Sequence, residues 1–230
     1  MKNRKADLDR FYQLLNKLKH HFPERKLAES NGRMKWPKKG VYFFFEKGEN
    51  RENGEPRVVR VGTHGITKSS KSTLWNRLKA HKGTNAGYGN HRGSVFRKLI
   101  GQAIINKDNL QNCYPNWGKG SKAAKDIRAR EKRMEKRVSE YLGQMPFLYL
   151  DVEEREMRKY IEQNAIALLS NKDKEKIDPA SDNWLGFYSG HKDIRQSNLW
   201  NSRDVEKDYD PAFLNKLEEL INQMIAKKSN

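Results

Sequence analysis

The sequence is poor in cysteine and in apolar residues, and both shortages exclude classes of protein. Cys113 is the only cysteine in 230 residues, so neither an internal disulfide nor a zinc site built from cysteines can form. Hydrophobic residues make up 35% of the chain, and no apolar run approaches the roughly 20 residues of a membrane-spanning helix. Residues 1–5 lead into an amphipathic segment, unlike a signal peptide. We therefore expect a soluble, cytoplasmic protein from a reducing compartment, without a membrane partner.

Acidic residues are scarce relative to basic ones. The chain has 29 Asp and Glu against 47 Lys and Arg, which gives a formal net charge of +18 at pH 7. Such a surplus repels itself, and it is most easily understood if the partner is a polyanion. Nucleic acid is therefore the expected partner. A structural protein of the ribosome, or a basic protein on an acidic organelle surface, is the alternative that composition leaves open.

Three short apolar runs predict β-strands. Residues 40–46 are dense in aromatic and β-branched side chains, and residues 57–62 and 146–150 follow the same tendency. The polar, turn-rich segment between the first two runs favours an antiparallel hairpin. These runs predict an α+β fold with a small three-stranded sheet, antiparallel or mixed, flanked by helices.

Helical periodicity predicts the remaining elements. Apolar residues recur at helical spacing over residues 7–20, 73–81, 94–106, 118–143 and 152–170, and Asp210-Pro211 opens a last amphipathic helix. We expect one domain over residues 1–230. It would consist of an N-terminal helix and connector (1–35), a core (36–201) with a helical insertion (118–143), and a C-terminal helix (205–230).

The insertion is strongly basic. Its apolar seam is narrow, and the rest of the predicted helix is charged, mostly positively. A solvated helix laced by Glu/Lys pairs and a helix that faces phosphates are both open alternatives. The candidates for backbone contact are Lys119, Lys122, Lys125, Arg128, Arg130, Arg133 and Arg137. The helical repeat spreads them around the circumference, so only a subset can face DNA.

One acidic residue falls on an apolar face. In the predicted helix over 152–170, Glu162 lies among Ala165, Ile166 and Leu169 rather than on the polar side. Glutamate is almost never fully buried without a partner. Glu162 is therefore expected either to form an ion pair or to hold a metal ion in a cleft.

The order of these features resembles that of the GIY-YIG nuclease family. The first family motif is present as Gly40-Val41-Tyr42, and the second as Arg60-Val61-Gly62, where arginine replaces the usual tyrosine. The following helix carries Arg77 at the position of the family's arginine, and Glu162 follows the third strand as the family's glutamate does. The resemblance covers residues 40–183.

The resemblance implies a role for each of these residues. Arg77 would bind the scissile phosphate, and Glu162 would hold one Mg²⁺, which Mn²⁺ can replace. Tyr42 would be the general base or orient the attacking water, and Arg60 would supply the positive charge that lowers its pKa. His81, one turn after Arg77, is the competing base.

Two further implications concern substrate and assembly. Asn183 would match the late asparagine of some members, and the activity would be Mg²⁺-dependent endonuclease cleavage of DNA, of the restriction type. Cutting both strands requires a second active site, hence a homodimer or sequential nicking. The alternatives are a nucleic-acid-binding module that has lost catalysis, and a structure-specific repair or RNA-processing nuclease. Without the resemblance, Tyr42 is simply a core aromatic in a Phe-rich strand.

Overall fold

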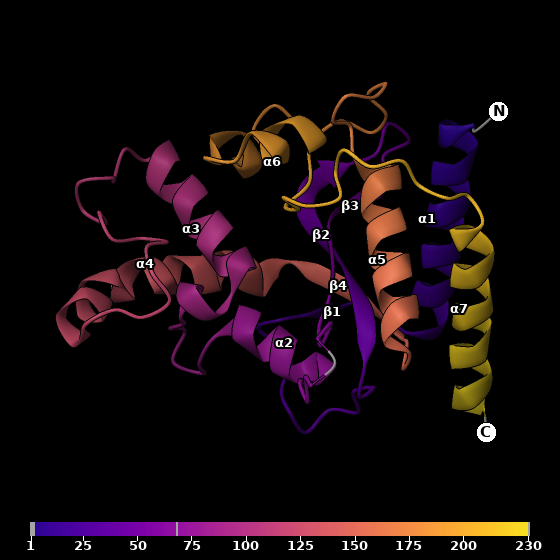
Figure 1. The fold of residues 1–230 in the computed structure, drawn as a ribbon, viewed down its shortest axis with the longest axis horizontal. Coiled ribbons are helices and arrows are strands. Elements are labelled where there is room, and N and C mark those ends of the chain that lie inside the picture. The colour runs from indigo at the N-terminus through magenta and orange to yellow at the C-terminus, as the bar shows by residue number, and fades with distance from the viewer. Residues whose placement is uncertain (1–2, 68, 230) are drawn as a thin grey trace.

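A computed structural model describes residues 3–67 and 69–229. Within them the chain forms a four-stranded sheet surrounded by helices (Figure 1), so the predicted α+β class is confirmed. The strands are β1 (Arg25–Lys26), β2 (Gly40–Asn50), β3 (Pro56–Thr63) and β4 (Pro146–Asp151), arranged in the order β1-β4-β2-β3. Every pair is antiparallel. The expected count of three strands was wrong by one, because β1 is a pair of residues, too short to show alternation in the sequence.

The first hairpin is longer than predicted. Strand β2 continues through Asn50, and the chain turns over residues 51–55, where the Arg51 amide donates to the Glu55 carbonyl at 2.7 Å. Polar residues occupy these strand positions because they pair with one another. Glu49 and Arg57, from the two strands, form an ion pair at 2.6 Å with nearly buried side chains. A polar stretch that looked like loop is therefore strand.

The helices follow the predicted periodicity closely. They are α1 (Arg4–His21), α2 (Leu74–Lys82), α3 (Val95–Lys107), α4 (Lys125–Gln144), α5 (Arg155–Leu169), α6 (Lys192–Ser197) and α7 (Phe213–Ser229). The insertion helix α4 begins later than expected, because residues 118–124 form an irregular segment. The short α6 was not predicted. In the described part of the chain, no helix is both long and apolar enough to cross a bilayer.

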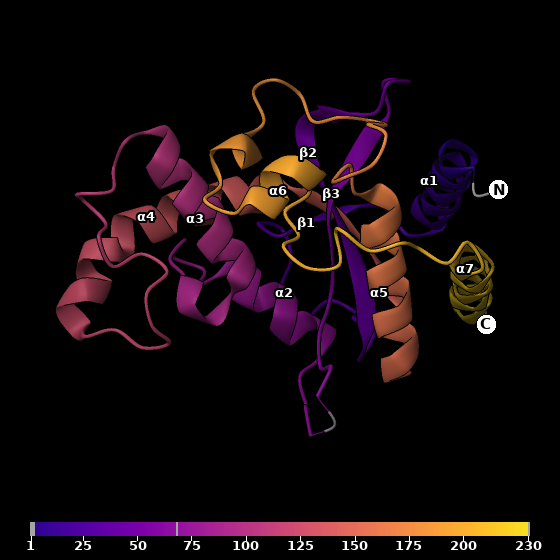
Figure 2. The ribbon, with the colours of Figure 1, turned by 45° about the horizontal axis from the view of Figure 1, so that its top comes forward.

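The sheet separates two groups of helices. Figures 1 and 2 show α5 on one side of it, with α1 and α7 side by side beyond, and α2, α3 and α4 on the other. Alternate residues of β2 serve the two sides. The Phe43 ring lies 5.8 Å from Phe11 of α1, whereas Phe44 lies 5.4 Å from Phe96 of α3. Tyr42 shares the face of Phe44, which directs it toward α2 and α3.

Candidate active site

The free edge of β3 is covered by side chains from distant parts of the chain. The Trp200 amide donates to the Val59 carbonyl at 2.7 Å, and the Asn201 side chain bonds both the amide and the carbonyl of Val61, at 3.1 and 2.9 Å. One residue pair further on, Glu162 Oε1 accepts the Thr63 amide at 2.9 Å. Helix α5 and the segment around Asn201 are thus fixed along β3, where the second motif lies.

A cleft of about 730 Å³ opens beside this edge. It collects side chains from β3, α2, α3, α5 and the segments on both sides of α6, and these include Arg60, Arg77, Lys98, Lys159, Glu162, His191, Asn201, Arg203 and Asp204. Glu162 and Asp204 are the only carboxylates among the lining residues that the structure describes. The structure therefore brings three predicted site residues, Arg60, Arg77 and Glu162, into one predominantly basic cleft.

Glu162 is half-buried and has no basic partner at ion-pair distance among the described residues. Burial raises the pKa of Glu162 to about 7, and the nearby Asp204 carboxylate adds to the rise. Arg60, the Thr63 amide and Arg77 act in the opposite direction without reversing it. A carboxylate in this state gains from a cation, because the cation stabilises its ionised form.

Among the described residues, the two arginines of the cleft also form no ion pair with a carboxylate. Arg60 is buried, donates to the Trp200 carbonyl, and lies over the Phe96 ring with Cζ 4.5 Å from its centroid. Burial lowers the pKa of Arg60. The Nε atoms of Arg60 and Arg77 are both buried without a hydrogen-bond partner. An anion in the cleft would satisfy both groups, and a planar guanidinium suits the oxygens of a phosphate.

Tyr42 and His81 lie directly behind the cleft. The Tyr42 hydroxyl is 3.0 Å from Nε2 of His81, whose Nδ1 is 2.8 Å from Oγ of Ser94. Burial lowers the pKa of His81 well below its usual value, and Arg77 and Arg60 lower it further, so the imidazole is neutral at pH 7. A neutral imidazole can accept the phenolic proton. Both side chains are fully enclosed, and neither lines the cleft.

The motif glycines make room for this arrangement. A β-carbon on Gly62 would lie 2.4 Å from the Tyr42 hydroxyl oxygen and within 2.6 Å of its ring. A β-carbon on Gly40 would lie 2.4 Å from the carbonyl oxygen of Leu150 in the paired strand β4. A larger residue at position 62 would displace Tyr42, and one at position 40 would displace strand β4.

The motifs are thus in contact with one another and with the cleft. A family model described as a GIY-YIG domain matches residues 2–227, nearly the whole chain. The chain belongs to the GIY-YIG family. No curated protein and no solved structure matches it. Membership of this nuclease family implies hydrolysis of phosphodiester bonds.

Asn183 does not join the other predicted site residues of this GIY-YIG protein. It lines a second cleft, of about 760 Å³, together with Glu46, Arg137 and Trp184. Asn201 is the late asparagine that reaches the motif strand and the first cleft. The sequence offered little to separate the two, because each follows or precedes a tryptophan in a loop-rich region.

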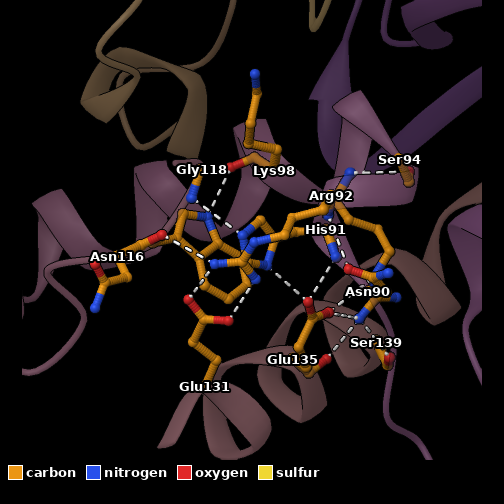
Figure 3. A network of polar contacts seen from close by, with 12 residues as sticks. Asn90, His91, Arg92, Ser94, Lys98, Asn116, Gly118, Glu131, Glu135 and Ser139 are labelled. Atoms are coloured by element: carbon orange, nitrogen blue, oxygen red, sulfur yellow. Dashed lines mark hydrogen bonds and ion pairs between the residues drawn. The ribbon is translucent and has the colours of Figure 1, made fainter. Parts of the chain in front are cut away.

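The basic insertion is anchored by buried ion pairs (Figure 3). Arg92 donates to both oxygens of Glu131 at 2.6 and 2.8 Å, and His91 Nδ1 lies 2.8 Å from Oε1 of Glu135. His91 Nε2 accepts the amide of Gly118 at 3.0 Å, which ties down the start of the insertion. These two glutamates were expected on the charged outer surface of the helix, yet they face inward because each meets an arginine or histidine.

Arg97 connects this network to the motif helix. It donates twice to Oε2 of Glu135, at 2.6 and 3.0 Å, and once to the His81 carbonyl, at 2.8 Å. Burial alone would raise the pKa of Glu135, but the hydrogen bond from His91 and the charge of Arg97 lower it. The insertion thus helps to position the end of α2 that carries His81.

The seven basic residues predicted to contact phosphates all lie outside the cleft. Arg130 pairs with Asp126 at 3.1 Å, and Arg137 pairs with Asp108 at 2.5 Å. The other five are exposed and form no ion pair within the described residues: Lys119, Lys122, Lys125, Arg128 and Arg133. They provide a basic surface on the insertion, separate from the cleft.

Three basic residues of the cleft rim were missed from the sequence. These are Lys98 on α3, Lys159 on α5 and Arg203 after α6. Lys159 could have been found, because it precedes Glu162 by three positions and so shares its helical face. Lys98 and Arg203 come from elements whose approach to β3 is set by tertiary packing, so no local spacing indicates them.

Proposed function

We propose that this protein is a Mg²⁺-dependent DNA endonuclease. One observation carries the proposal: two guanidinium groups without carboxylate partners and a carboxyl of pKa about 7 face the same basic cleft. Phosphodiester hydrolysis needs positive charge at the phosphoryl oxygens, an acceptor for the proton of water, and a site for a metal ion. The cleft and the residues behind it offer a group for each.

Arg77 is the proposed ligand of the scissile phosphate. Its buried, unpartnered Nε would donate to a phosphoryl oxygen, and its planar fork can donate a second bond in parallel. Arg60, which also lines the cleft, would add positive charge where the transition state accumulates negative charge. Neither group needs to break an existing ion pair to do so.

Glu162 is the proposed magnesium ligand, with Asp204 nearby. Mg²⁺ characteristically binds one or two carboxylates, retains several waters and takes phosphate oxygens from the substrate. That habit suits this cleft, because Glu162 and Asp204 are the carboxylates among its described lining residues. When bound, Mg²⁺ would supply Lewis-acid stabilisation of charge on the phosphate. It would also keep Glu162 ionised below the pH at which the free carboxyl titrates.

Tyr42 and His81 are the proposed proton acceptors. The Tyr42 oxygen would take the proton of the attacking water while its own proton passes to Nε2 of neutral His81, 3.0 Å away. Ser94 holds the other imidazole nitrogen and so fixes the orientation of the ring. Burial, Arg77 and Arg60 lower the pKa of His81, so its Nε2 is unprotonated and can accept a proton from the phenol.

Glu162→Gln tests the proposal. The substitution removes the charge that holds the metal but keeps an oxygen for the Thr63 amide, so plasmid cleavage in Mg²⁺ should be abolished while DNA affinity stays within about threefold. Glu156→Gln, on an exposed face of the same helix, is the matched control and should cut like the parent. Cleavage by the variant at the parental rate, or undiminished cleavage in a chelator, would refute the proposed metal role.

The subtype proposed is restriction-type double-strand cleavage by two copies of the chain, with the exposed basic residues of the insertion on the DNA backbone. Two sites acting together convert supercoiled plasmid directly into discrete linear fragments, whereas one site acting alone accumulates nicked circles. Gel electrophoresis of plasmid cut about once per molecule therefore distinguishes paired sites from a single site.

A nucleic-acid-binding module without catalysis is the second candidate. It is favoured by the complete enclosure of Tyr42 and by Arg60 in the place of the second motif tyrosine. In that case the parent protein would bind DNA and leave it intact in both Mg²⁺ and Mn²⁺. The cleavage assay with Glu162→Gln beside it therefore decides between the two candidates.

A further inference from the structure

Two exposed apolar side chains lie at the cleft. Among the described residues, the large hydrophobic side chains that remain exposed are Ile66 (39%), Val95 (46%), Phe187 and Tyr188. Ile66 follows β3, Val95 begins α3, and both line the cleft that holds Arg77 and Glu162. A single exposed apolar residue is ordinary on a protein surface. Two from separate elements, on the wall of a strongly charged cleft, present apolar contact area to whatever enters it.

Val95 also marks a helix N-terminus inside the cleft. Its neighbour Ser94 caps α3 by accepting the Arg97 amide at 3.3 Å. The first turn contains no acidic residue, although helices favour negative charge there, and Lys98 of the same turn lines the cleft. The partial positive charge of the helix end is therefore left without a counter-charge on the helix itself.

A buried guanidinium with one unpartnered nitrogen lies against the same turn. Arg60 is 7% exposed, its Nε has no hydrogen-bond partner, and its guanidinium covers the ring of Phe96, the second residue of α3. Each carboxylate that lines the cleft already has a partner, since Glu162 accepts the Thr63 amide and Asp204 pairs with Lys207 at 2.6 Å.

We infer that the first turn of α3 is a second substrate-contact site, which binds a non-scissile phosphate of the nucleic acid. Lys98 and the helix N-terminus would take the phosphate, and Val95 with Ile66 would pack on the sugar and base between it and the scissile phosphate. The inference rests on the proposed function, because it requires a nucleic-acid strand in the cleft. In this inference the bound strand runs through the cleft from Arg77 to the first turn of α3.

A charge placed at Val95 separates a binding role from a structural one. Val95→Asp should not lower the thermal midpoint and can raise it, because a carboxylate at the first helical position complements the helix dipole. The same carboxylate should weaken binding of a labelled DNA duplex, measured by anisotropy without Mg²⁺, by about tenfold or more through repulsion of the phosphate. Val95→Asn is the matched neutral control, with an expected loss within about threefold.

A second pair of variants tests the same site without changing the helix end. Lys98→Ala should weaken binding and reduce the slope of log K against log salt by about 0.7–0.9, the value for one phosphate contact. Lys107→Ala, at the far end of the same helix, should leave that slope unchanged.

The outcomes separate failure of the inference from failure of the proposed function. A parent protein that binds no nucleic acid refutes the proposed function. A parent that binds, with Val95→Asp equal to Val95→Asn and Lys98→Ala equal to Lys107→Ala, overturns the second contact site alone. If Val95→Asp fails to fold, the two lysine variants decide.

Discussion

The arginines of the insertion network and those of the cleft all have buried side-chain nitrogen atoms, yet their surroundings are opposite. Arg92 and Arg97 each make two bonds to a glutamate, and their side chains are 3% and 0% exposed. Arg60 and Arg77 have no carboxylate at hydrogen-bond distance within the described residues, and each has a buried Nε without a partner. The first pair holds elements together. The second pair is proposed to bind the phosphates of the substrate.

The difference has an energetic meaning. A buried charge without a counter-charge destabilises the folded state. A buried ion pair with good geometry does not, and the folded state is strongly destabilised only when one partner of the pair is removed. The cleft therefore carries a cost that the network does not, and an anionic ligand would offset it. The same contrast holds for the carboxylates, because the pKa of Glu135 is lowered while that of Glu162 is raised.

The largest expected effect comes from removing an arginine of the cleft. Arg77→Ala should lower kcat for DNA cleavage by about 10³–10⁵-fold, the usual range for a guanidinium that stabilises a phosphoryl transition state. The free energy of unfolding should stay the same or rise slightly, because the substitution removes an unpaired charge near Arg60. Arg77→Lys should restore little activity, since an ammonium group lacks the planar fork. A large loss of stability with modest loss of activity would place Arg77 among the structural arginines.

An arginine of the network should behave in the opposite way. Arg97→Ala leaves Glu135 buried and partly unpaired and should reduce the free energy of unfolding by about 3–5 kcal/mol, measured by urea denaturation. Substituting the pair together, with Arg97→Met and Glu135→Leu, should recover much of that loss, because no charge is then stranded. Failure of the double variant to recover would mean that the other bonds of Arg97, including the one to the His81 carbonyl, dominate.

The smallest expected effect is a pH dependence of stability with opposite signs for the two glutamates. The pKa of Glu162 is about 7 when folded against a usual 4.5, so the folded state holds its proton more tightly, and stability falls as pH rises between these values, by up to about 3 kcal/mol. Glu162→Gln should abolish that fall and be more stable than the parent at pH 8. Glu135 has a lowered pKa, so its contribution is present above the unfolded pKa and is lost as pH falls. Equal slopes for the parent and Glu162→Gln would contradict the assignment.

Much of the fold was predictable from local patterns. Helical periodicity located α1 and α7 within a few residues, and the aromatic run of β2 identified the central strand. The strand residues that were not predicted share one physical cause, because they are strands only through pairing with residues elsewhere in the sequence. Strand β1 exists only because it pairs with β4, and the polar end of β2 is a strand because Glu49 meets Arg57.

The site divides along the same line. Arg60, Arg77 and Glu162 were predictable because each belongs to a motif or sits conspicuously on an apolar helix face. Asn201 and Lys98 reach the cleft through the packing of α6 and α3 onto the sheet, and local sequence contains no record of that packing. The enclosure of Tyr42 beneath Arg60 likewise depends on Gly62, whose missing side chain leaves the necessary space.

The covered edge of β3 limits how this protein can associate with itself. An exposed edge strand invites a second chain to extend the sheet, but the Val59 carbonyl, the amide and carbonyl of Val61 and the Thr63 amide are already occupied by Trp200, Asn201 and Glu162, respectively. Sheet extension across this edge would have to strip away the groups that form the cleft. If two copies cooperate as proposed, they would therefore have to meet through another surface, which would leave both clefts open.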